Sequence, residues 1–162
     1  MLMEWAWLIP VFSFGAAPLI VVFGKYLPGK GALLSIGAIA AGFVVFWILL
    51  GGYLDAGPSA KNCFTSTDTG ALTCHYQRTW FNAGLPGLGE SVKLDWGMLV
   101  DPLTVGMVGL VTFVALMVQV YSLGYMRGDP RFGWYFAFHA LFAAAMLTLV
   151  LADNFLLLYV AW

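Results

Sequence analysis

The chain has 162 residues, of which 62% are apolar and 9% charged, and its mean hydropathy is +0.89. Such a composition lies outside the range of soluble domains and predicts an integral membrane protein. The net charge is −1, and the seven basic residues are scattered along the chain. A nucleic-acid backbone needs an extended surface of clustered Lys and Arg, which these residues cannot supply, so nucleic-acid binding is excluded.

Four apolar stretches reach the roughly 18 to 20 residues that a membrane-spanning helix needs. They are Trp5–Phe23, Ala32–Leu54, Leu103–Tyr125 and Trp134–Leu151, and none contains Lys or Arg. A signal peptide is the alternative for the first stretch, but no basic residue precedes it. A fifth stretch, Phe155–Trp162, is too short to cross and predicts the start of a helix that is cut off.

These stretches predict an all-α polytopic membrane protein with four transmembrane helices and the start of a fifth. We expect helices 1 and 2 in residues 1–54, an external loop in 55–100, helices 3 and 4 in 101–152, and the truncated helix in 153–162. The short loops 24–31 and 127–133 carry basic residues, which the positive-inside rule assigns to the cytoplasm. The N-terminus and the 55–100 loop then lie outside.

Both cysteines of the chain, Cys63 and Cys74, fall in the loop that the charge argument assigns to the oxidising side. A disulfide that closes this short loop is one interpretation, and two unpaired thiols in a flexible loop are the other. Metal binding is less well supported, because His75 is the only other good ligand nearby and the spacing matches no zinc pattern.

The second half of the external loop has the alternation of a half-buried strand. Apolar residues at 92, 94, 96 and 98 alternate with polar residues or glycine at 91, 93, 95 and 97. The aromatic segment Tyr76–Phe81 is a suitable partner across the turn Asn82–Glu90. We therefore expect a β-hairpin on the membrane surface, with Trp80 and Trp96 at the interface.

Few ionisable side chains lie in or beside the spans, and each has a structural alternative. Asp101 precedes Pro102 and is expected to cap the third helix. Asp153 either caps the next helix or handles protons. His139 lies inside the fourth span, either as a neutral hydrogen-bonding group or as a proton relay. We therefore take His139 and Asp153 as proton-pathway candidates.

Small and uncharged polar residues within the spans indicate helix packing rather than chemistry. Gly106, Gly109 and Gln119 in the third span belong to this group, because small residues let helices approach closely. No phosphate-binding loop, nucleophile elbow or metal cluster stands out. We expect no catalytic residue and no bound metal in this chain.

Three segments in order resemble a known membrane-protein family. They are LDWGMLVDPLT at 94–104, YSLGYMRGD at 121–129 and LADNFLLLYVAW at 151–162. Together they resemble the antiporter-like subunit called chain L or chain 5 of proton-pumping NADH:quinone oxidoreductase, respiratory complex I. The earlier part resembles this family in layout, whereas the segment Asn62–Cys74 and His139 depart from its pattern.

The resemblance implies a proton-translocating membrane subunit in a bacterial plasma membrane or an organellar inner membrane. Its partners would be other membrane subunits of the complex and the lipid bilayer. NADH, FMN, the iron–sulfur clusters and quinone would belong to other subunits, so this chain is expected to bind no redox cofactor. In the family a glutamate follows the tryptophan that matches Trp162, so the main proton-handling residues would lie beyond this chain.

Two other functional classes stay open at this point. The large subunit of a multisubunit cation/proton antiporter shares the same membrane module and needs neither NADH nor quinone. A small tetraspan scaffold without enzymatic activity is the third interpretation, against which the short apolar stretch at the C-terminus argues.

Overall fold

The computed structural model describes residues 5–24, 26, 28–55, 62–65, 70–84 and 91–162, with the backbone alone at 28, 78–84 and 91–96. Its elements in chain order are α1 (Leu8–Phe23), the short 3-10 helix η2 (Pro28–Gly31), α2 (Ala32–Asp55), β1 (Cys63–Thr65), β2 (Leu72–Gly84), β3 (Ser91–Val100), α3 (Pro102–Tyr125), α4 (Phe132–Leu151) and α5 (Phe155–Ala161). The mostly helical architecture confirms the predicted fold class.

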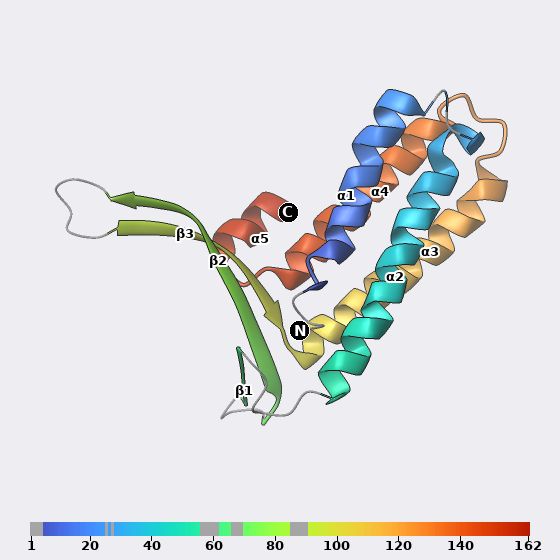
Figure 1. Ribbon diagram of the computed structural model, residues 1–162. Coiled ribbons are helices and arrows are strands. Elements are labelled where there is room, and N and C mark those ends of the chain that lie inside the picture. The colour runs from blue at the N-terminus through green and yellow to red at the C-terminus, as the bar shows by residue number, and fades with distance from the viewer. Residues whose placement is uncertain (1–4, 25, 27, 56–61, 66–69, 85–90) are drawn as a thin grey trace.

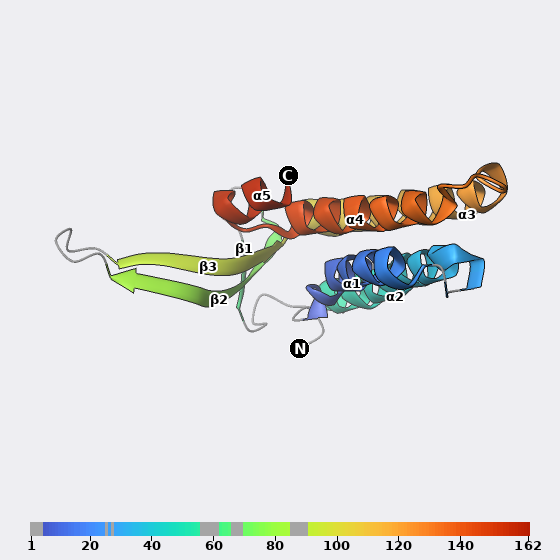
Figure 2. The same ribbon diagram turned by 90° about the horizontal axis from the view of Figure 1, so that it is seen from above.

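The four longer helices form an antiparallel bundle in two layers. Figure 2 shows α1 beside α2 in one layer and α3 beside α4 in the other. The layers meet where α1 packs against α4 and α2 packs against α3. Large apolar side chains cover the outside of the bundle, with Val22 65%, Phe113 50% and Phe142 63% exposed. An apolar exterior of this kind fits lipid as the surrounding solvent.

Three helices, α2, α3 and α4, are long and apolar enough to cross a membrane. The first predicted span is shorter than expected, because α1 begins at Leu8 and has 16 residues. At 1.5 Å per residue it is about 24 Å long, less than a hydrocarbon core of about 30 Å. Pro10 lies in the first turn of α1, where its nitrogen, which has no hydrogen to donate to the Ala6 carbonyl, removes no bond within the helix, whereas Pro18 lies farther inside.

The described residues between α2 and α3 form an antiparallel sheet in the order β1-β2-β3. Strands β2 and β3 confirm the predicted hairpin, and Tyr76 lies opposite Met98 in their register. Both strands extend beyond the segments that the sequence predicted, which were 76–81 and 91–98, and strand β1 was not predicted. The side chains of Trp80 and Trp96 lie outside the described residues, so their interfacial placement stays a prediction.

The hairpin leaves the bundle at the end where α2 ends and α3 begins, and it runs across the direction of the helix axes (Figure 1). Its base is part of the hydrophobic core. Cys74, Met98 and Val100 are buried in one cluster with helix residues such as Ile9, Leu49 and Leu147. The sheet is therefore joined to the helices by side-chain packing as well as by the chain.

One close helix contact shows why a small residue is needed in α3. A Cβ atom added to Gly109 would lie 2.5 Å from Cζ of Phe46 in α2, whereas one added to Gly106 would meet nothing within 4 Å. The two glycines share a helix but differ in what they face.

We predict that Gly109→Val lowers the free energy of unfolding by about 1–3 kcal/mol, because the Phe46 ring or the α3 backbone must move. The measurement is thermal unfolding in detergent followed by circular dichroism. Gly106→Val is the matched control and should unfold within error of the wild type. Equal losses in both variants would contradict the α2–α3 contact.

Candidate functional site

The Asp153 carboxylate, between α4 and α5, contacts the three-stranded sheet. Its Oδ1 lies 3.1 Å from Nδ1 of His75, and its Oδ2 accepts a hydrogen bond of 2.7 Å from Nε2 of Gln77. The Asp153 side chain is 9% exposed and that of His75 36%. A largely buried carboxylate therefore receives two side-chain partners from strand β2.

The backbone reinforces this contact. The Asp153 N–H donates to the Gly97 carbonyl of β3 at 3.3 Å, and Ala152 forms an antiparallel bridge with Met98. A Cβ atom at Gly97 would lie 2.7 Å from Oδ2 and 2.9 Å from Cβ of Asp153, so glycine is needed for this close approach. We call Asp153, His75, Gln77 and Gly97 the Asp153 latch.

A disulfide lies directly beside the latch. Cys63 and Cys74 are opposite each other in β1 and β2, and the structure joins their sulfur atoms. The next residue, His75, stacks its ring on Phe64 with the centroids 5.2 Å apart. A pocket of about 470 Å³ opens here, lined by Asn62, Phe64, His75 and Gln77. Strand β1, although short, thus supports the histidine that contacts Asp153.

The two helix starts near the latch have different capping residues. The Asp101 carboxylate accepts a hydrogen bond of 2.6 Å from the Thr104 N–H at the start of α3, where Pro102 occupies the first helical position. At the start of α5 the cap is Asn154, whose Oδ1 accepts from the Leu157 N–H at 2.8 Å. The alternative of Asp153 as the capping residue is therefore wrong: its carboxylate turns to the sheet.

A second group of polar side chains lies inside the bundle, between α2, α3 and α4. Gln119 Nε2 donates to Ser35 Oγ at 2.7 Å, and that hydroxyl donates to the Phe136 carbonyl at 3.2 Å. The hydroxyls of Ser122 and Tyr135 are 2.8 Å apart, and the Tyr135 ring stacks on His139. We call Ser35, Gln119, Ser122, Tyr135 and His139 the polar layer.

Two atoms of the polar layer lack a hydrogen-bond partner among the described residues. They are Oε1 of Gln119, a residue with no exposed surface, and the buried Nε2 of His139. Buried polar atoms without protein partners are usually satisfied by water, so the layer has the chemistry of an internal hydration site.

The predicted site residues thus fall into separate places. Asp153 belongs to the latch at the sheet end, His139 belongs to the polar layer within the bundle, and the structure does not bring the two together. Within the described residues, no group of three or more His, Cys, Asp or Glu could hold a metal ion.

Sequence reasoning missed the partners of both groups. His75 was considered only as a metal ligand, Gln77 and Ser35 carried no signal, and Gly97 appeared only as a member of an alternating strand. Their importance depends on contacts across 76 residues for Gln77–Asp153 and 84 residues for Gln119–Ser35. The buried position of Gln119 was the one available hint, because an amide inside an apolar span needs a partner.

Known proteins match almost the entire chain. Residues 87–136 match the family described as NADH-ubiquinone oxidoreductase (complex I), chain 5 N-terminus. The F(420)H(2) dehydrogenase subunit L of Methanosarcina mazei is 37% identical over 98% of this chain and 20% of its own length. The NADH-quinone oxidoreductase subunit L of Mycobacterium tuberculosis is 32% identical over 98% of this chain and 23% of its own.

A third relative carries the name chain 5. The NADH-ubiquinone oxidoreductase chain 5 of Acanthamoeba castellanii is 34% identical over 87% of this chain and 18% of its own length. The chain spans about a fifth of the length of these relatives. By these similarities the chain belongs to the family of complex I membrane subunits called subunit L or chain 5.

Proposed function

We propose that this chain is the N-terminal bundle of a proton-translocating subunit in a respiratory oxidoreductase that passes electrons to a quinone. Its relatives are named as subunits of NADH-quinone oxidoreductase and of F(420)H(2) dehydrogenase. Because these names differ in the electron donor, the shared role is expected in the membrane part rather than in donor binding. The cation/proton antiporter is the alternative, but the named relatives are dehydrogenase and oxidoreductase subunits.

The similarity to these subunits carries the proposal, and the Asp153 latch suggests what this part of the chain does within it. The latch links the three-stranded sheet to the start of α5, where Asn154 caps the helix and Asp153 is held by two strands. Movement of α5 at this end would have to break contacts to His75, Gln77 and Gly97. We propose that the Asp153 latch fixes the position of α5 relative to the bundle. The distances between proton-handling groups on α5 and those on the neighbouring helices would then stay constant.

The redox chemistry is proposed to lie in partner subunits. In this proposal the chain binds no flavin, iron–sulfur cluster or quinone, and it contributes proton-conducting and scaffold groups. The partners would be further membrane subunits of the oxidoreductase. The energy of electron transfer would reach this chain as changes in nearby charge, which shift the proton affinities of buried groups.

The proposed orientation places the N-terminus and the 55–100 loop outside, with loops 24–31 and 127–133 on the cytoplasmic side. Two independent features support it. Lys30 lies in η2, and Arg127 and Arg131 lie in the connection between α3 and α4, at the bundle end opposite the sheet (Figure 1). The sheet itself contains Arg78 and Lys93, and the disulfide lies at the sheet end. A plasma membrane or an organellar inner membrane would meet both conditions.

The test of the proposed complex is co-purification. An affinity-tagged chain, extracted with mild detergent from its own membrane, should carry oxidoreductase subunits and quinone reduction driven by NADH or F420H2. Mass spectrometry identifies the subunits, and absorbance at the quinone band measures the rate. Co-purification with antiporter subunits and no dehydrogenase activity would favour the antiporter alternative, whereas a chain that purifies alone would favour the scaffold.

For the latch, we predict that Asp153→Ala raises amide hydrogen exchange in residues 153–161 about tenfold or more. Loss of hydrogen bonds to a charged group costs about 1.5–3 kcal/mol. A loss of this size raises the population of the locally opened state, and therefore the exchange rate, by about tenfold or more. Exchange is measured by mass spectrometry on the purified complex. Asp55→Ala, at the exposed end of α2, is the control. Unchanged exchange in Asp153→Ala would show that the backbone bridge alone holds this segment.

For His139, we predict that His139→Phe and His139→Asn both lower proton uptake per quinone reduced. Neither replacement titrates near neutral pH, so both remove a relay, whereas Asn preserves a hydrogen-bonding group in the polar layer. Uptake is measured with a pH-sensitive dye in vesicles that contain the complex. Full activity in His139→Asn with loss in His139→Phe would assign His139 the neutral hydrogen-bonding role instead.

A further inference from the structure

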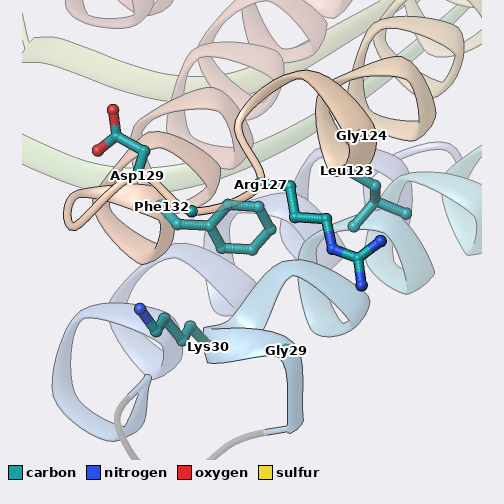
Figure 3. A pocket seen from close by; sticks show the side chains of 8 residues that line it. Gly29, Lys30, Leu123, Gly124, Arg127, Asp129 and Phe132 are labelled. Carbon is teal, nitrogen blue, oxygen red and sulfur yellow. The ribbon is translucent and has the colours of Figure 1, made fainter.

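A pocket of about 500 Å³ lies at the end of the bundle opposite the sheet, between η2 and the α3–α4 connection. Its lining consists of Gly29, Lys30, Leu123, Gly124, Arg127, Gly128, Asp129 and Phe132. Figure 3 shows the Phe132 ring in the middle of this lining, with the Lys30 side chain on one side and the Arg127 side chain on the other. Neither the latch nor the polar layer shares a residue with it.

The two loops that form the pocket are held together by backbone contact. A Cβ atom at Gly133, in the first turn of α4, would lie 2.9 Å from the Lys30 carbonyl oxygen. This approach brings η2 against the start of α4, although 103 positions separate Lys30 from Gly133 in sequence. The pocket therefore has walls from two loops in a fixed relation.

The electrostatics of the pocket favour an anion. Among the described residues, neither Lys30 nor Arg127 takes part in an ion pair, since the one such contact joins His75 and Asp153. The only carboxylate in the lining, that of Asp129, accepts a hydrogen bond of 2.6 Å from the Arg131 N–H and so is already engaged by its own turn. The formal charge of the lining side chains is +1, from two cations and one carboxylate.

Aromatic side chains place this end of the bundle at a membrane interface. Tyr26, Tyr125 and Trp134 are 86%, 73% and 55% exposed, and Tyr121 stacks on Tyr125 with centroids 5.7 Å apart. Exposed Tyr and Trp at the ends of apolar helices are typical of the headgroup region of a bilayer. The pocket thus lies at the depth of lipid phosphates, with Leu123 and Phe132 as apolar lining.

We infer that this pocket binds the phosphate-bearing headgroup of an anionic phospholipid, with Lys30 and Arg127, on opposite sides of the lining, as the cations that attract its charge and with Leu123 and Phe132 against its glycerol and upper acyl carbons. Arg suits phosphate because its planar guanidinium presents several donors at once. Basic pockets between helices near a membrane surface recognise anionic headgroups by this chemistry. A soluble phosphate would satisfy the cations but leave the apolar lining without a partner.

The test compares lipid retention by native mass spectrometry. The protein is extracted in mild detergent from its own membrane, delipidated and titrated with phosphatidylglycerol or phosphatidylcholine. We expect the wild type to retain phosphatidylglycerol preferentially. Affinity should fall about fivefold for Lys30→Gln or Arg127→Gln and roughly thirtyfold for the double variant. Arg131→Gln, in the same loop but outside the lining, is the matched control and should retain the lipid.

Three results would overturn the inference. Equal retention of both lipids would remove the role of charge, and an equal loss in Arg131→Gln would indicate general attraction to the loop rather than this pocket. Displacement of phosphatidylglycerol by millimolar inorganic phosphate would assign the site to a soluble phosphate. Arg127→Lys checks folding, since it retains the charge and should lose less affinity than Arg127→Gln while melting at the wild-type temperature.

Discussion

The base of the three-stranded sheet is buried among the helices, and much of the structure depends on that packing. Cys74, Met98 and Val100 share a hydrophobic cluster with residues of α1, α2, α3 and α4. Because this end of the sheet is fixed, β2 and β3 present His75, Gln77 and Gly97 to the α4–α5 connection, and Asp101 stands where α3 begins. The Asp153 carboxylate is buried there against its hydrogen-bonding partners. Because a buried carboxylate without partners is costly, this contact favours a single arrangement of the sheet and the α4–α5 connection.

The two ends of the bundle have different chemistry, and their separation follows from the antiparallel order of the helices. The sheet end has the disulfide and the Asp153 latch, whereas the other end has Lys30 and Arg127, which pair with no carboxylate among the described residues. An apolar bundle about one bilayer thick keeps these groups apart, because neither set can enter the hydrocarbon. Substitutions in the proposed lipid site and in the Asp153 latch should therefore act independently of each other.

The polar layer is the main exception to an otherwise apolar interior. Ser35, Gln119 and the Phe136 carbonyl form a chain of hydrogen bonds across three helices. In hydrocarbon such bonds fix helix register, since a displaced partner leaves a polar group unsatisfied. Oε1 of Gln119 and Nε2 of His139 have no hydrogen-bond partner among the described residues, and these are the atoms at which water would complete the hydrogen bonding of the layer.

The sequence by itself determined the membrane class, the positions of most helices and the hairpin, because each depends on local periodicity or on a run of apolar residues. The ordered segments from Leu94 to Trp162 also determined the family, which the comparisons confirm. The sequence also placed the start of the first span too early, at Trp5, whereas α1 begins at Leu8. Only the tertiary structure decided that Asn154 caps α5 while Asp153 binds the sheet, that Ser35 meets Gln119, and that Lys30 and Arg127 line one pocket. These contacts join residues far apart in the chain, and a single sequence has no local signal for which distant partner a polar side chain will meet.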